Sequence, residues 1–164
     1  MIKFNWLLLS ITSLIPFIMA YIWYRPNVYS VIFIGWDLSQ FNFRWSISSA
    51  ILLILLGFMY SITLSYQVIH QLHFQSLLMN EVGFLKGEGN AYKDLIYIFE
   101  LYGKNFRSFK HGAFHGLLNS IFIVLPILIY GKYTSNSSWR SVFFQWIYWM
   151  ICAILMSGII CELY

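Results

Sequence analysis

Charged residues are absent from four long stretches of this chain, and this pattern constrains the fold more than any other feature. The stretches run from Phe4 to Tyr24, between Arg44 and Glu81, from His111 to Gly131 and from Ser141 to Cys161. A helix needs roughly 20 apolar residues to cross a bilayer core about 30 Å thick. Only 10% of the 164 residues are charged, whereas soluble domains carry about 25%. The sequence therefore predicts an integral membrane protein that is solvated largely by lipid.

We predict an all-α fold, a polytopic membrane protein with four transmembrane helices in an up-down bundle. Residues 1–164 are expected to form a single membrane domain, with helices at about residues 4–24, 45–70, 112–131 and 141–163. A long loop at about residues 74–110 joins the second helix to the third. Since no breaker occurs before Gly83, the second helix is expected to continue beyond the membrane.

Three local features qualify this outline. Pro16 and Pro126 fall inside the first and third helices, where proline removes a backbone donor and should kink the helix. The apolar run at residues 31–34 is too short for a further crossing, so residues 25–44 are expected to lie at the membrane interface. Residues 91–102 are expected to form a helix within the long loop, with its charged side chains turned toward water.

The basic residues are divided unequally between the two ends of the predicted helices. Six of them lie at one end (Lys3, Lys86, Lys93, Lys104, Arg107 and Lys110) and four at the other (Arg25, Arg44, Lys132 and Arg140). Because Lys and Arg near helix ends favour the cytoplasm, we expect both termini and the long loop to be cytoplasmic. Basic residues that flank the helices also account for the net charge of +4. Since no basic run interleaves with a polar platform, we expect no nucleic-acid partner.

Polar residues at membrane depth are costly and are the default candidates for function. Thr63, Gln67 and His70 lie on one stripe of the second helix, and His73 continues that row. His111, His115 and Asn119 lie on one stripe of the third helix. Both stripes approach the end at which the fourth helix carries Glu162. The sequence therefore predicts a polar vestibule at the cytoplasmic side, formed by Thr63, Gln67, His70, His111, His115, Asn119 and Glu162.

Three uses of this vestibule stay open. The histidines could hold a metal, because pairs spaced by three or four on a helix present two imidazoles to one ion; the candidates are His70, His73, His111 and His115. The sequence lacks the HExxH pattern and has too few histidines for the arrays of membrane desaturases, so it assigns no metal or cofactor. The histidines could instead carry protons, since imidazole titrates near pH 6.5. Finally, all these groups could simply join helices through hydrogen bonds of about 1 kcal/mol each.

Small residues repeat at four-residue spacing on three of the predicted helices. They are Gly57, Ser61 and Ser65 on the second, Gly112 and Gly116 on the third, and Ala153, Ser157 and Cys161 on the fourth. Such spacing lets helix backbones approach closely and is typical of contact faces. The sequence does not say whether each face meets a helix of the same chain or of another copy.

Several short motifs resemble a bacterial membrane family catalogued as domain of unknown function 1761. The motifs are Trp23-Tyr24-Arg25-Pro26, His111-Gly-Ala-Phe-His-Gly116, Leu125-Pro126, Trp146-x-Tyr148-Trp149 and Met156-Ser-Gly158-Ile-Ile. The resemblance covers the first helix and the chain from about residue 111 onward. It implies a four-helix integral membrane protein of the bacterial inner (plasma) membrane and supplies no substrate, cofactor or catalytic residue.

We expect a membrane component or assembly subunit and not an enzyme, because no nucleophile has a base at readable spacing and no phosphate-binding glycine loop occurs. The expected partners are the lipid bilayer and either a second copy of the chain or another membrane protein. The alternatives are a small transporter or pH-responsive pore that uses the histidine vestibule, and a membrane enzyme with a histidine-ligated metal.

Overall fold

The computed structural model describes residues 3–25, 28, 45–135 and 137–164, and within them the fold is entirely helical. Four helical segments are long and apolar enough to cross a membrane: Trp6–Trp23, Ile47–Val68, Phe109–Ser135 and Trp139–Leu163. The predicted all-α fold with four membrane-crossing helices is confirmed. The interfacial segment predicted at residues 25–44 lies almost wholly outside the described residues.

The first span is interrupted one turn before its proline. Helix α1 (Trp6–Thr12) and helix α2 (Leu14–Trp23) are separated at Ser13. Pro16 has no N–H to donate to the carbonyl of Thr12 and its ring crowds that turn, so the helix is interrupted there. The carbonyl of Pro16 also accepts a hydrogen bond of 2.6 Å from the Tyr148 hydroxyl, which ties the interruption to the last helix.

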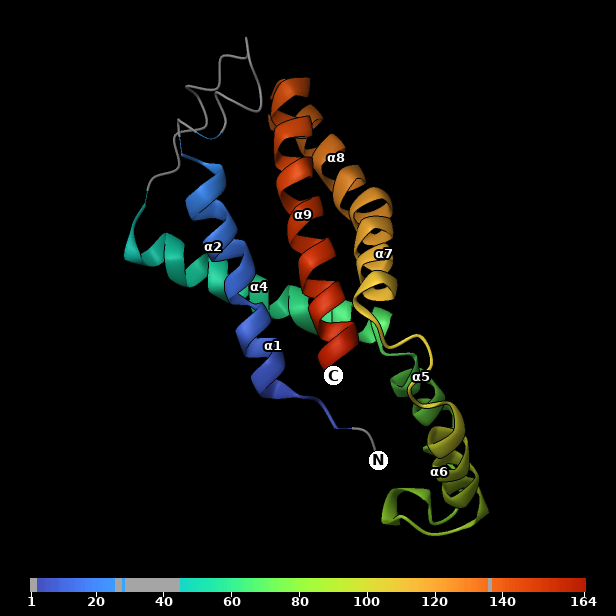
Figure 1. Ribbon diagram of the computed structural model, residues 1–164. Coiled ribbons are helices and arrows are strands. Elements are labelled where there is room, and N and C mark those ends of the chain that lie inside the picture. The colour runs from blue at the N-terminus through green and yellow to red at the C-terminus, as the bar shows by residue number, and fades with distance from the viewer. Residues whose placement is uncertain (1–2, 26–27, 29–44, 136) are drawn as a thin grey trace.

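Helix α9 (Trp139–Leu163) is the central element of the bundle. It contributes a long row of buried residues to the core, including Phe144, Met156 and Ile160. Helix α7 (Phe109–Asn119) lies beside it along much of its length (Figure 1). The two backbones come so close that a Cβ atom at Gly112 or Gly116 would collide with α9 main-chain atoms. The small-residue face predicted on the third helix therefore meets the fourth helix of the same chain.

The third span contains a wide turn where the proline removes a hydrogen bond. A π-helical turn, η3 (Ser120–Val124), connects α7 to helix α8 (Leu125–Ser135). Pro126 follows immediately and cannot donate to the preceding turn. The indole N–H of Trp146 donates to the carbonyl of Ser120 at 3.1 Å, so a polar group at this irregular turn is satisfied by the neighbouring helix.

The second span ends earlier than the sequence predicts. Helix α4 (Ile47–Val68) stops at Val68, and helix α5 (His70–Leu77) begins after Ile69, whose φ of −99° and ψ of 82° are not helical. The expectation of one helix through residue 70 and onward is wrong. Tertiary packing supplies the reason: Ile69 is buried, and the carbonyl of Val68 accepts from the Cys161 thiol. No local signal such as Gly or Pro marks this break.

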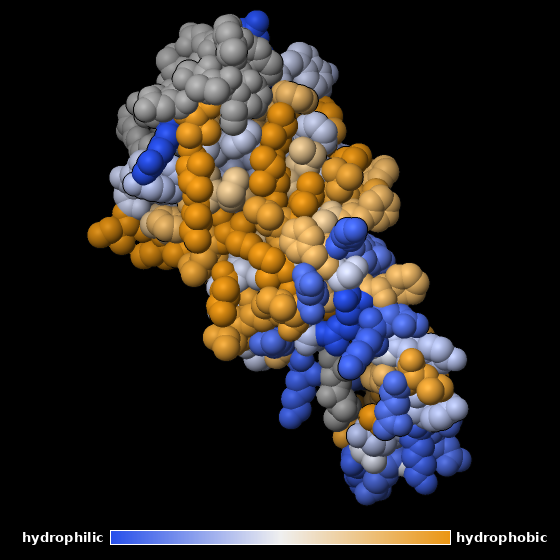
Figure 2. Space-filling view, viewed as in Figure 1, coloured by the Kyte–Doolittle hydropathy of each residue, from blue (hydrophilic) through white to orange (hydrophobic). Residues whose placement is uncertain are grey.

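A polar arm leads away from the four membrane-crossing segments. It consists of α5, the short helix η2 (Phe84–Lys86) and helix α6 (Asn90–Tyr102), and Figure 1 shows it extending beyond the bundle. On the face seen in Figure 2, the arm is mainly hydrophilic and the bundle mainly hydrophobic. The side chains of Lys93, Asp94 and Glu100 are exposed, as predicted for this helix, while Leu95 is buried. The loop predicted at residues 74–110 is thus partly helical.

Candidate functional site

Three histidines meet at the junction between the bundle and the polar arm. His70 is the first residue of α5, and His111 and His115 lie one turn apart on α7. The Nε2 atom of His111 lies 3.2 Å from Nε2 of His70 and 3.2 Å from Nε2 of His115. One ring nitrogen from each of the three residues lies within 4.8 Å of the other two. We call His70, His111 and His115 the histidine cluster.

Local structure explains why these rings converge. The break at Ile69 ends α4 and starts α5 at His70, while the buried side chain of Ile69 fixes the turn in the core. On the opposite side, Ser108 caps α7, and its side chain accepts the backbone N–H of His111 at 3.3 Å. The four-residue spacing of His111 and His115 places both rings on one face of α7. The starts of α5 and α7 and the four-residue spacing of His111 and His115 therefore determine the position of the cluster.

The spacing of the ring nitrogens suits a metal ion. Imidazole nitrogens bind Zn²⁺ at about 2.0–2.1 Å, so neighbouring ligands of a tetrahedral site lie roughly 3.3–3.4 Å apart. Two of the three nitrogen pairs, at 3.2 Å, are close to that separation. Only the pair His70 and His115 has to close in from within 4.8 Å. Three protein nitrogens would leave a fourth coordination position open.

Hydrogen bonding among the rings is a poor alternative. A neutral imidazole nitrogen is either a donor or an acceptor, with one hydrogen or one lone pair in the ring plane. The single Nε2 atom of His111 faces two Nε2 atoms at once, so it cannot make two linear hydrogen bonds. A cation placed between the three nitrogens would accept all three lone pairs together.

The electrostatic setting keeps at least one of the rings neutral. Partial burial lowers the pKa of His70 below its ordinary value of 6.5, and the neighbouring rings of His111 and His73 lower it further. Neutral imidazole is the form that ligates a metal. At neutral pH, His70 is therefore ready to bind an ion without first losing a proton.

A second polar group lies about one to three turns deeper between α4 and α7. The side-chain amide of Asn119 donates to the Gln67 side-chain oxygen at 2.9 Å, and its own oxygen accepts the Tyr60 hydroxyl at 2.5 Å. The structure thus brings together Gln67 and Asn119, two members of the predicted vestibule. Tyr60 was not among the predicted residues, although it lies seven positions before Gln67 and so on the same helical stripe.

The structure places the remaining predicted residues apart from the histidine cluster. Thr63 is exposed, and its hydroxyl donates to the Met59 carbonyl of its own helix at 3.1 Å. The ring of His73 stacks against Tyr66, although His73 lines the same groove as His70 and His115. Glu162 is exposed at the end of α9. Among the residues that the structure describes, neither His73 nor Glu162 belongs to the group with metal-ligand spacing.

Comparison with known proteins adds no assignment, since no family model, no curated protein and no solved structure matches this chain. The fold itself carries the conclusion. Four apolar helices of membrane-crossing length imply contact with a lipid bilayer, and the chain is a multi-pass membrane protein with a histidine cluster at one end of its bundle.

Proposed function

We propose that this protein binds a divalent transition-metal ion through His70, His111 and His115. The observation that carries the proposal is the convergence of three imidazole nitrogens from two helices, with two separations of 3.2 Å. Imidazole suits Zn²⁺, Cu²⁺, Ni²⁺ and Fe²⁺, whereas Mg²⁺ and Ca²⁺ prefer oxygen ligands. The proposed activity is metal binding at the edge of the membrane, with one coordination position left for a further ligand.

The alternatives suggested by the sequence account for less of this geometry. Hydrogen bonding between helices explains Gln67 and Asn119, but the Nε2 atom of His111 has one hydrogen or one lone pair for two partners. We call the line along which α4 faces the third span (Phe109–Ser135) the seam. A pore would need polar side chains along the whole of this seam. Beyond Tyr60 that seam is instead lined by Leu56, Val124 and Leu128.

We further propose that the role is binding and not catalysis. Within the described part of the chain, the group with ligand spacing consists of three histidines, which suffice to bind an ion. A structural or assembly role, with a second copy or another membrane protein as partner, is compatible with this proposal. The resemblance to domain of unknown function 1761 is compatible as well, since it implies a four-helix membrane protein.

Metal titration of the purified protein in detergent tests the proposal. We expect one Zn²⁺ per chain by elemental analysis and calorimetry. Loss of groups that only orient a ligand weakens metal binding by about 10–100-fold, so His70→Ala, His111→Ala or His115→Ala should weaken it by at least that factor. The matched control is His73→Ala, which removes a neighbouring histidine outside the cluster and should leave the affinity unchanged. A wild-type protein that binds no Zn²⁺, or equal effects of all four variants, would contradict the proposal.

We propose that the cluster and the arm face the cytoplasm, because the arm and its ends carry Lys86, Lys93, Lys104, Arg107 and Lys110. For a bacterial host this means the inner (plasma) membrane. A cysteine introduced at exposed Glu88 tests the orientation. It should resist a membrane-impermeant thiol reagent in intact cells and react after lysis; reaction in intact cells would reverse the assignment.

A further inference from the structure

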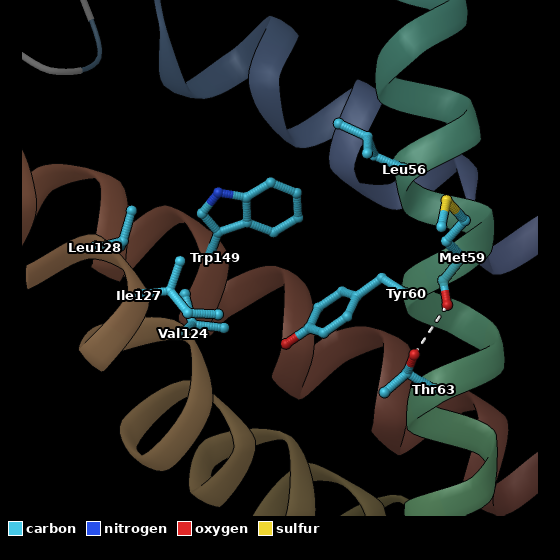
Figure 3. Close-up of a pocket in the computed structure, with 8 residues that line it drawn as sticks. All are labelled: Leu56, Met59, Tyr60, Thr63, Val124, Ile127, Leu128 and Trp149. Atoms are coloured by element: carbon cyan, nitrogen blue, oxygen red, sulfur yellow. Dashed lines mark hydrogen bonds between the residues drawn. The ribbon is translucent and has the colours of Figure 1, made fainter. Parts of the chain in front are cut away.

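Two grooves follow one another along the seam between α4 and the third span. The first has a volume of about 470 Å³ and is lined by apolar side chains, namely Leu56, Met59, Val124, Ile127, Leu128 and Trp149, together with Tyr60 and Thr63 (Figure 3). The second, of about 450 Å³, is lined by Gln67, His70, His115 and Asn119 among others. Its residues come from the end of α4, from the start of α5 and from α7 and η3. The two grooves adjoin at a hydrogen bond, because the hydroxyl of Tyr60 in the first donates to Asn119 in the second.

The second groove is also lined by Leu118, Phe122 and Ile123. The seam therefore gains polar side chains along its length and ends at the proposed metal site. Figure 3 shows the apolar end, where α4 contributes Leu56 and Met59 on one side and the third span contributes Val124 and Ile127 on the other. Groove volumes of this size are typical of small-molecule sites. Among the described residues that line the two grooves, none is acidic.

We propose that this seam binds a single-chain amphiphile with an anionic head, of the fatty-acid class. The hydrocarbon chain lies in the apolar groove, and the carboxylate occupies the open coordination position at the histidine cluster. This inference rests on the proposed metal-binding function. Three neutral imidazoles leave the full positive charge of the ion uncompensated, so an anionic oxygen ligand is favoured there. Carboxylate oxygens bind Zn²⁺ at about 2.0–2.2 Å.

The head group of the amphiphile, and not its hydrocarbon chain, must supply the preference for the seam. Burying apolar chain gains free energy over aqueous exposure but little over lipid, since lipid tails are equally apolar. Preference for the seam over bulk lipid must therefore come from the head group. The inference predicts that the acid binds far more tightly than its neutral ester and that this difference requires the metal.

Trp149 provides the reporter, because its ring lines the apolar groove. A brominated fatty acid quenches nearby indoles, and the difference between wild type and Trp149→Phe isolates the signal of this residue. With Zn²⁺-loaded protein in detergent, we expect saturable quenching by the acid. The methyl ester, or the acid after chelation of Zn²⁺, should require at least about tenfold higher concentration, a coupling typical of linked sites. His115→Ala should remove the preference for the acid.

A second variant tests the groove without touching the ligands. Thr63 is exposed in the middle of the seam, so Thr63→Phe should block the chain and abolish saturable quenching while Zn²⁺ binding persists. Leu52→Phe, at a 54% exposed position of α4 that lines neither groove, is the matched control and should behave as wild type. If Zn²⁺ binds but acid and ester quench alike, the amphiphile inference is overturned and the metal proposal stands. If Zn²⁺ does not bind, both fall.

Discussion

The third span makes two contacts of opposite character, and their difference shows how one helix can combine stability with a site. Toward α9, α7 presents Gly112 and Gly116, and main chain meets main chain at Ser157 and Ala153. On its other side, Asn119 donates to Gln67 of α4 and the ring of His115 lies 5.2 Å from that of His70 of α5, and all four residues line a groove. The first contact leaves no space for a methyl group, whereas the second encloses space that a ligand could occupy.

In lipid this division has a physical basis. Apolar side chains gain little by leaving lipid for a protein interior, so helices associate through close backbone packing and interhelical hydrogen bonds. The α7–α9 contact uses the first means and the seam between α4 and α7 uses the second. A face held by backbone packing tolerates no change of volume, but a face held by a few hydrogen bonds can remain partly open.

The largest effect should come from adding volume to the tight contact. Gly116→Val places its side chain against the backbone of Ala153 and Ile154, which cannot move without displacing α9. We expect a loss of about 3 kcal/mol or more in the free energy of unfolding, at the upper end for overpacked sites, measured by denaturation in mixed detergent micelles.

Gly131→Ala is the matched control for this loss. A Cβ at Gly131 would meet nothing within 4 Å, and alanine is favoured over glycine inside a helix by about 1 kcal/mol. This variant should unfold at the same or a slightly higher denaturant concentration. Equal destabilisation by both substitutions would show that the α7–α9 contact is not tight.

Metal should strengthen the open seam by a somewhat smaller amount. An ion that binds only the folded protein stabilises it by about 2.7 kcal/mol at a free concentration 100 times the dissociation constant. We expect Zn²⁺ to raise the thermal midpoint of wild type and of His73→Ala, but not of His111→Ala. A rise that persists in His111→Ala would place the bound metal elsewhere.

The hydrogen bonds of the seam should contribute less. Tyr60→Phe removes the hydroxyl that donates to Asn119, and bonds of this kind in membrane bundles average about 0.6 kcal/mol. A double-mutant cycle with Asn119→Ala, read from the same unfolding curves, should return a coupling of about that size. Additive effects of the two substitutions would mean that the bond contributes nothing in solution.

The smallest effect should be a pH dependence of the metal-free protein. Because the pKa of His70 is lowered in the folded state, the unfolded chain binds the proton more readily at pH values below 6.5. Stability should therefore be level above pH 6.5 and decline as the pH falls below it, only modestly because the ring is exposed. Unfolding curves recorded with a chelator should lose part of this slope in His70→Ala and keep most of it in His73→Ala. A slope unaffected by His70→Ala would assign it to other groups.

The sequence predicts the membrane-crossing segments well because their signal is the absence of charge over some 20 residues, which needs no tertiary information. It also predicts the two helical stripes that contain Gln67 and Asn119, because each stripe follows from helical spacing. The break at Ile69 could not be predicted. It depends on how Ile69 and the Val68 carbonyl fit against α9, and no helix-breaking residue such as Gly or Pro occurs there.

That break explains why the histidine cluster differs from the predicted vestibule. A continuous helix would have kept His70 and His73 on one line with Thr63, and all of them would have shared one environment. The new helix start instead brings His70 to His111 and leaves His73 beside Tyr66. Glu162 was predicted from its position at the same end of the bundle, but helical spacing cannot give the direction of a side chain on a terminal turn.

The contact between His70 and His111 also means that the polar arm begins and ends at nearly the same place on the bundle. These residues are 41 positions apart in the chain, yet their ring nitrogens lie 3.2 Å from each other, so the arm leaves the bundle and returns to nearly the same point. Closing such a length of flexible chain carries an entropic penalty that grows only slowly with the number of residues. Insertions or exchanges within the arm would therefore leave the geometry of its base intact, and the arm could diversify while the membrane-embedded part stays fixed.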